Sequence, residues 1–288
     1  MLKGMRSVVW VWLLAAGWSA AAQAMQPAPP PWLVVSSIPP LNLLVAALVG
    51  PEVKTHTLLS ANADPHEQAL KLSERTLIAE AGLLIWLGPN FERYLTKALP
   101  APNHHVQLGQ LPGLTWPAGR SGTDLHLWLN PNNAKLMAQA IAERLCAQLP
   151  ASAPAIQRRL SLLLTRIDSV AEQIKTRLAP VQAAPFGVYH DGYGHWVHYF
   201  GLNQVAALSA QPEQHPGAKH LLAAKQKLVG ARCLISDFAE GNAQKLQELL
   251  QLPVQVADPL AQARPYADYG EFLLALADVF SGCLTTPG

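Results

Sequence analysis

A long amphipathic segment at the middle of the chain most constrains the fold. Residues Ala153–Leu178 contain no glycine, and Pro154 and Pro180 lie at its two ends. Apolar residues recur at spacings of three or four, which predicts one helix with a single apolar face. At 1.5 Å per residue this helix would be about 39 Å long. Its length and central position favour a rigid backbone joining two halves; the alternative is a long surface helix of a single domain. The apolar positions are Ile156, Leu160, Leu163, Ile167, Val170, Ile174 and Leu178.

Short strand-like runs alternate with helical stretches on both sides of this segment. Such alternation predicts an α/β fold with mostly parallel sheets covered by helices. Four strands in each half suit two small separate sheets better than one continuous sheet. We therefore expect an N-terminal αβ domain at residues 25–150, a linking helix at 151–180 and a C-terminal αβ domain at 181–288. The expected strands are Leu33–Ser37, Val53–Leu59, Leu83–Leu87, Leu125–Leu129, Pro185–His190, Gln204–Leu208, Cys233–Asp237 and Val254–Ala257.

The first 24 residues have the three-part pattern of a secretory signal peptide. Lys3 and Arg6 precede an apolar run from Val8 to Ala16, and small residues end at Ala24. The run is too short for a typical transmembrane helix, and no cysteine follows it as a lipid attachment site. We expect cleavage after Ala24 and an exported, soluble protein without stable membrane insertion.

The charge balance excludes one large class of partners. Only 14% of residues are charged and the formal net charge is +2. Nucleic-acid binding depends on basic residues that neutralise phosphates. The sequence therefore predicts no nucleic-acid partner.

Three cysteines in an exported chain leave one without an intramolecular partner. Cys233 lies in a predicted strand and Cys283 near the end of the last helical stretch, whereas Cys146 lies on the apparent apolar face of a helix. We predict a Cys233–Cys283 disulfide and a buried Cys146 thiol. The alternative, three free thiols, is disfavoured by an oxidising compartment.

Three histidines occupy similar positions in successive αβ units. His66, His126 and His190 each follow or end a strand-like run, at intervals of 126 − 66 = 60 and 190 − 126 = 64 residues. The carboxyl ends of parallel strands converge on one crevice in open α/β sheets. Three imidazoles meeting there would suit a borderline metal such as zinc. Each histidine alone could equally be a packed or exposed residue.

A fourth, oxygen ligand would come from the second half of the chain. Asp258, at the end of the last predicted strand, is the first candidate, although an aspartate before a proline is also a common turn residue. Asp237 is a weaker candidate, and Glu67 could reach the metal or cap a helix. We do not expect six other histidines to be ligands: His104, His105, His195, His198, His215 and His220.

Six segments together resemble one known family. They are ANADPHEQAL, LLIWLGPNFERYL, DLHLWLNP, VYHDGYGHWVHYFGL, PGAKHL and VADPL. In this order they resemble the periplasmic zinc-binding proteins of bacterial ABC importers, within the wider zinc and manganese solute-binding family. The likeness extends from about Pro31 to Cys283.

The resemblance has specific implications. It implies two four-stranded domains joined by one long helix, with one Zn²⁺ as transported ligand in the interdomain cleft. It implies ligands at His66, His126 and His190, a carboxylate position at Asp258, and the same Cys233–Cys283 disulfide. The implied partner is an inner-membrane ABC permease, and the implied form is a periplasmic monomer.

The chain departs from the family pattern at two places. Many zinc importers of this type have a long His- and acid-rich loop before the second ligand, whereas residues 100–122 are short and contain only His104 and His105. Some relatives have a glutamate directly before the first ligand, where this chain has Pro65. The fourth ligand could therefore be Asp258 or water.

Two other functions remain to be distinguished from zinc capture. A manganese receptor or metal-linked adhesin of the same family would favour more oxygen ligands than this set provides. A secreted zinc hydrolase could also use three histidines and an open position, but it needs a general base. Glu67 could serve as that base, yet the sequence has no HExxH motif or nucleophile elbow. We therefore expect a binding protein and no enzyme.

Overall fold

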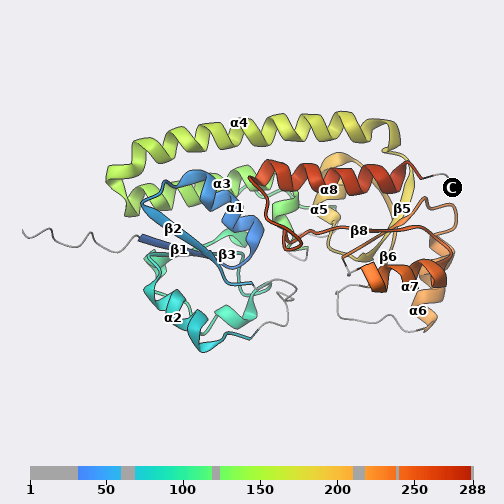
Figure 1. Ribbon diagram of the computed structural model, residues 1–288, viewed down its shortest axis with the longest axis horizontal. Helices are drawn as coiled ribbons and strands as arrows, with labels where there is room; N and C mark the ends of the chain where they lie inside the picture. Colours follow the sequence, from blue (N-terminus) through green and yellow to red (C-terminus); the bar gives the residue numbers. More distant parts are fainter. Residues whose placement is uncertain (1–31, 60–68, 119–123, 210–217, 238–239, 287–288) are drawn as a thin grey trace, which may run out of the picture. The chain divides into compact units, whose positions relative to one another are not determined.

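The computed structural model describes residues 32–59, 69–118, 124–209, 218–237 and 240–286. These residues form two αβ halves connected by one long helix (Figure 1). Among them, no helix is both long enough and apolar enough to cross a membrane.

The first half contains a four-stranded parallel sheet. Its strands are β1 (Trp32–Ser36), β2 (Val53–Thr57), β3 (Leu83–Trp86) and β4 (His105–Gln107), in the order β2-β1-β3-β4. The helices of this half are α1 (Pro39–Leu48), α2 (Leu72–Glu80) and α3 (Pro131–Gln148). Strands β1 and β3 are apolar and largely buried, as expected for inner strands of a parallel sheet covered on both faces.

The second half repeats this arrangement. Its strands are β5 (Pro185–His190), β6 (Asn203–Ser209), β7 (Leu234–Ser236) and β8 (Val254–Val256), all parallel, in the order β6-β5-β7-β8. Its helices are α5 (Gly194–Phe200), α6 (Ala218–Lys227), α7 (Glu240–Leu250) and α8 (Tyr269–Leu284). The expectation of two small parallel sheets is confirmed.

The predicted strand at Leu125–Leu129 is wrong. Residues Leu127–Leu129 form a short 3-10 turn, and Asn130 then caps α3 by accepting hydrogen bonds from the backbone amides of Asn132 and Asn133. The three turn residues are fully buried, so their apolar run mimics a buried strand, which periodicity alone does not distinguish. The fourth strand is the short β4, which the sequence analysis missed.

The linking helix α4 (Ala153–Leu178) has the bounds predicted from sequence. It packs on α1 and α3 of the first half and on α8 of the second (Figure 1). Six of the seven predicted apolar positions are buried, and Leu160 is half-buried. Ion pairs accompany this packing: Lys135–Asp168 to α3 at 2.6 Å, Arg166–Asp268 at 3.2 Å to the residue that caps α8, and Arg177–Asp278 to α8 itself. One continuous apolar core therefore includes residues of both halves.

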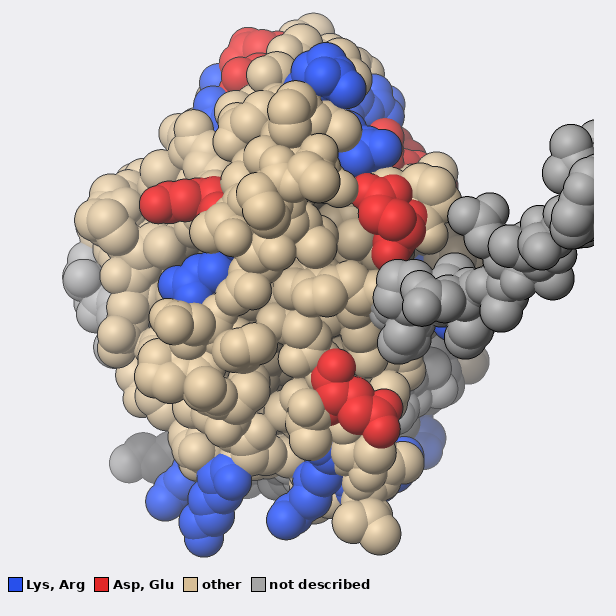
Figure 2. Space-filling view, turned by 90° about the vertical axis from the view of Figure 1, so that its left-hand side faces the viewer, with Lys and Arg blue, Asp and Glu red and all other residues tan. Residues whose placement is uncertain are grey.

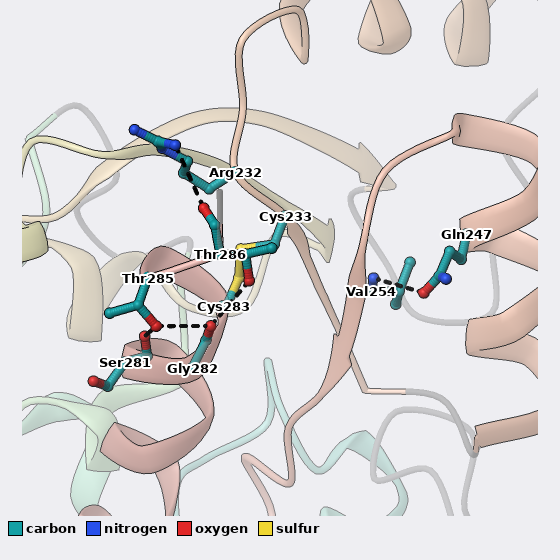
Figure 3. Close-up of a disulfide and its surroundings, with 9 residues drawn as sticks. All are labelled: Arg232, Cys233, Gln247, Val254, Ser281, Gly282, Cys283, Thr285 and Thr286. Carbon is teal, nitrogen blue, oxygen red and sulfur yellow. Dashed lines mark hydrogen bonds between the residues drawn. A yellow bond between two sulfur atoms is a disulfide. The ribbon is translucent and has the colours of Figure 1, made fainter. Parts of the chain in front are cut away.

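A disulfide joins Cys233, just before β7, to Cys283 in the last turn of α8, as predicted (Figure 3). Both residues are fully buried, with their Cα atoms 5.5 Å apart. Beside the bridge, the Arg232 guanidinium donates a 3.5 Å hydrogen bond to the carbonyl of Thr286. Cys146 is a free thiol, but it is half-buried rather than fully buried, because it lies at the edge of α3 against Gln157 of α4.

Charged side chains are sparse on the face shown in Figure 2. Lys and Arg lie mainly toward its upper and lower edges, with one group halfway down, and Asp and Glu are scattered from the upper edge to the lower part. Neither sign forms a continuous patch on this face, in keeping with a net charge of only +2.

Candidate metal centre

Two of the three predicted histidine ligands meet in a buried pair. His190 is the last residue of β5, and His126 directly precedes the 3-10 turn that leads into α3. Their ring centroids are 4.9 Å apart, and the residues are 4% and 8% exposed. The pair therefore draws one imidazole from each half of the chain.

The His126 ring is held by a carboxylate from its own half. Its Nδ1 lies 3.0 Å from Asp124 Oδ1, which also accepts the backbone amide of His126 at 3.2 Å. Burial alone would raise the pKa of Asp124, but its hydrogen bonds with the ring and backbone amide of His126 help to lower this pKa to about 2. The carboxyl is therefore ionised at neutral pH and accepts the proton of Nδ1. Phe91 and Trp128 pack around the same ring, with centroids at 5.8 and 5.2 Å.

His190 has the corresponding partner in the second half. Its Nδ1 lies 3.1 Å from Oδ2 of Asp237, which follows β7, the neighbour of β5 in the sheet. A carboxylate that fixes Nδ1 of a histidine leaves Nε2 for a metal and increases the basicity of the ring. Asp237, considered from sequence as a possible ligand, instead lies in this orienting position.

Gly192 closes the site over both rings. A Cβ atom at this position would lie 2.7 Å from His190 Cε1 and 2.9 Å from His126 Nε2. Any residue other than glycine at this position would therefore collide with the two rings.

Of the three remaining candidate ligands, His66, Glu67 and Asp258, the structure describes only Asp258. His66 and Glu67 lie outside the described residues. The Asp258 carboxylate accepts the backbone amides of Gln262 at 2.9 Å and Ala263 at 2.8 Å, and the Tyr266 hydroxyl at 3.2 Å. In this structure Asp258 thus organises the loop after β8. Within the described ranges, no three His, Cys, Asp or Glu side chains form a group that could hold a metal ion.

The sequence analysis assigned no role to three buried polar residues. The sequence Asp124-Leu125-His126 could have indicated a partner for His126, because an aspartate side chain can accept a hydrogen bond from the backbone amide two residues later. His195, excluded as a ligand, is fully buried and bonded to the Asp124 carbonyl. Glu92, in a segment with no distinctive signal, is fully buried where β1 and β3 end; it accepts hydrogen bonds from the Ser37 hydroxyl and the Gly88 amide.

Solved structures share this fold. A crystal structure of ZnuA aligns with a TM-score of 0.76 at 21% identity, covering 88% of this chain and 99% of that chain. The laminin-binding protein Lmb of Streptococcus agalactiae, described as a bifunctional protein with adhesin and metal-transporting activity, aligns with a TM-score of 0.78 at 19% identity, covering 88% and 100%. Two parallel αβ sheets bridged by one helix are the architecture that this chain shares with these two structures.

Sequence relatives specify the family. The high-affinity zinc uptake system protein ZnuA of Yersinia pestis is 30% identical, with 87% of this chain and 91% of the relative covered. The protein of the same name from Haemophilus ducreyi is 28% identical, with 88% and 93% covered. A family model described as ZnuA, the periplasmic component A of the zinc-uptake complex, matches residues 34–283. This chain belongs to the ZnuA family.

Proposed function

We propose that this chain is a periplasmic receptor that captures one Zn²⁺ and delivers it to an inner-membrane ABC permease. The observation that carries the proposal is the buried His126–His190 pair, in which an aspartate holds each Nδ1. Neutral imidazoles oriented in this way are ligands suited to zinc. The names of the ZnuA relatives support zinc as the cargo.

His66 completes the proposed ligand set with His126 and His190, and Asp258 or water takes the fourth position. A carboxylate offers about four acceptor sites, so Asp258 keeps one site for the metal beside its three loop hydrogen bonds.

The remaining features of the proposal concern cellular context. Residues 1–24 are a signal peptide removed on export, residues 25–150 and 181–288 are the two domains, and residues 151–180 are the helix that joins them. The receptor acts as a monomer, and the names of the ZnuA relatives support a role in zinc uptake rather than in catalysis.

Competition titration against a chromogenic zinc chelator tests the proposal. The mature chain should bind zinc with a stoichiometry near one, and a variant with alanine at His66, His126 and His190 should lose this binding. His198→Ala, at an exposed position on α5, is the matched control and should bind as the unmodified chain does. Equal binding by the triple variant would refute the assigned site.

Metal selectivity tests the cargo separately. Replacing His190 with Glu substitutes an oxygen for a nitrogen ligand, which favours manganese over zinc. Calorimetry with both ions should show weaker zinc binding and improved manganese binding for His190→Glu. A preference for manganese in the unmodified chain would instead indicate a manganese receptor.

A further inference from the structure

His195 belongs to the second half of the molecule, but its ring is hydrogen-bonded to residues of the first half. It lies on α5, five residues after His190, and its side chain is fully buried. The partners of its ring come from the first half. A backbone carbonyl is an acceptor only, so Nε2–H of His195 donates to the carbonyl of Asp124, at 2.9 Å.

Three residues of the first half, Asp124, Asn133 and Trp116, form the socket that surrounds this ring. The side-chain amide of Asn133, on α3, donates to Nδ1 of His195 at 3.4 Å, and the Trp116 ring packs beside it with centroids 5.5 Å apart. Asn133 is itself fixed by two hydrogen bonds with the backbone of Thr115, at 2.8 and 3.0 Å. The socket therefore holds the neutral imidazole in one tautomer.

Asp124 is the point where this contact meets the metal site. Its carbonyl is bonded to His195 of the second half, and its carboxylate holds Nδ1 of His126. A shift of the Asp124 backbone would move the carboxylate and with it the His126 ring. A single residue thus connects a helix of the second half to a ligand of the first.

We infer that His195 is a positioning residue that sets the His126 ligand relative to the half that supplies His190. This inference rests on the proposed zinc-binding function. Replacing His195 with Leu removes the donor to Asp124 and leaves its buried carbonyl without this partner. Because partners beyond the ligands affect metal affinity about 10–100-fold, and His195 acts through Asp124, we expect about a tenfold loss of zinc affinity.

Two conservative variants separate positioning from general packing. In His195→Gln the longer amide reaches the Asp124 carbonyl and should restore most of the zinc affinity. In His195→Asn the shorter amide reaches only the position of Nδ1, so the affinity should remain low. This pair decides the question even where His195→Leu folds poorly, and circular dichroism of each metal-free variant establishes that it is folded.

A double-mutant cycle provides a second readout. If His195 acts through Asp124, then His195→Leu should cost little further affinity once Asp124→Ala has removed the carboxylate. A purely structural role would give additive losses. Additive losses, or equal affinities of the Gln and Asn variants, would overturn the inference.

The unmodified chain and His198→Leu serve as controls in the same chelator titration. Both should bind zinc equally, because His198 is exposed on the same helix. Failure of both to bind would contradict the proposed function itself. If His195→Leu binds zinc as tightly as both controls do, only the positioning role is contradicted.

Discussion

At the scale of the residue, His126 and His190 share one arrangement, in which an aspartate is bonded to Nδ1 of the ring. Each imidazole is oriented by an aspartate of its own half, Asp124 for His126 and Asp237 for His190. Each ring therefore has an orienting partner in its own half, and His126 is also connected to the second half through the bond between Asp124 and His195. Such orientation reduces the entropy that metal binding must remove from the side chains.

Replacing Asp237 with Ala should weaken zinc binding by about 10–100-fold, because His190 loses the partner that fixes its tautomer and increases its basicity. Chelator competition measures the loss. Asp168→Ala is the control, since Asp168 is an exposed aspartate on α4 paired with Lys135. A loss as large in the control would show that the effect is one of global charge.

Asp258→Ala tests the fourth ligand. If water can replace the carboxylate, zinc affinity should fall less than in His190→Ala, which removes a nitrogen ligand from the buried pair. Calorimetry gives the order of the two losses. Abolished binding in Asp258→Ala together with intact binding in His190→Ala would show that the site has been assigned to the wrong residues.

At the scale of the element, the disulfide attaches α8 to the second sheet. Cys233 and Cys283 are 50 residues apart, and closing a loop of that size restricts the unfolded chain by about 4 kcal/mol in the chain-entropy model. The bridge is therefore expected to secure the packing of α8, which contacts both α4 and the sheet.

Replacing both Cys233 and Cys283 with Ala should lower the free energy of unfolding by about 4 kcal/mol. Urea denaturation of the metal-free protein measures this change. Cys146→Ala, which removes the free thiol, is the control and should have a much smaller effect. Peptide mapping without reductant should show that Cys146 is absent from any cross-linked peptide.

At the scale of the whole molecule, buried Glu92 makes stability depend on pH. Burial raises the pKa of its carboxyl from 4.5 to about 7, although hydrogen bonds from Ser37 and the backbone amides of Gly88 and Leu87 act in the opposite direction. Between these two values the folded protein holds a proton that the unfolded chain releases. Stability therefore falls as pH rises through this window.

The full effect of the Glu92 shift, complete above about pH 7, is on the order of 3 kcal/mol. Glu92→Gln keeps a neutral side chain at every pH, so its stability should decline less than that of the unmodified chain between pH 5 and pH 8. Urea denaturation at several pH values gives the unfolding free energy of both proteins as a function of pH. Other groups titrate in both proteins, so their contributions cancel in the difference between the two curves. Parallel curves would show that Glu92 does not titrate in this range.

The sequence by itself determined the elements whose pattern is local. The 3.6-residue periodicity of α4 specified its bounds, and seven of the eight predicted strands lie within a few residues of those observed. The expected export of the chain and the positions of Cys233 and Cys283 in its second half indicated the disulfide. The exception was Leu125–Leu129, where burial on all sides removed the alternation that separates a strand from a turn.

Only the tertiary structure decided what surrounds the histidines. Asp124, Asp237 and His195 acquire their roles from contacts across 2, 47 and 71 residues of chain, and the two long-range contacts leave no periodic trace in the sequence. The sequence pointed to His126 and His190 because both lie in strand-like runs, and strand ends converge in parallel sheets, yet only His190 ends a strand. Which carboxylate would hold each ring, and that Asp258 would bond to its own loop, depended on packing between elements that local pattern does not encode.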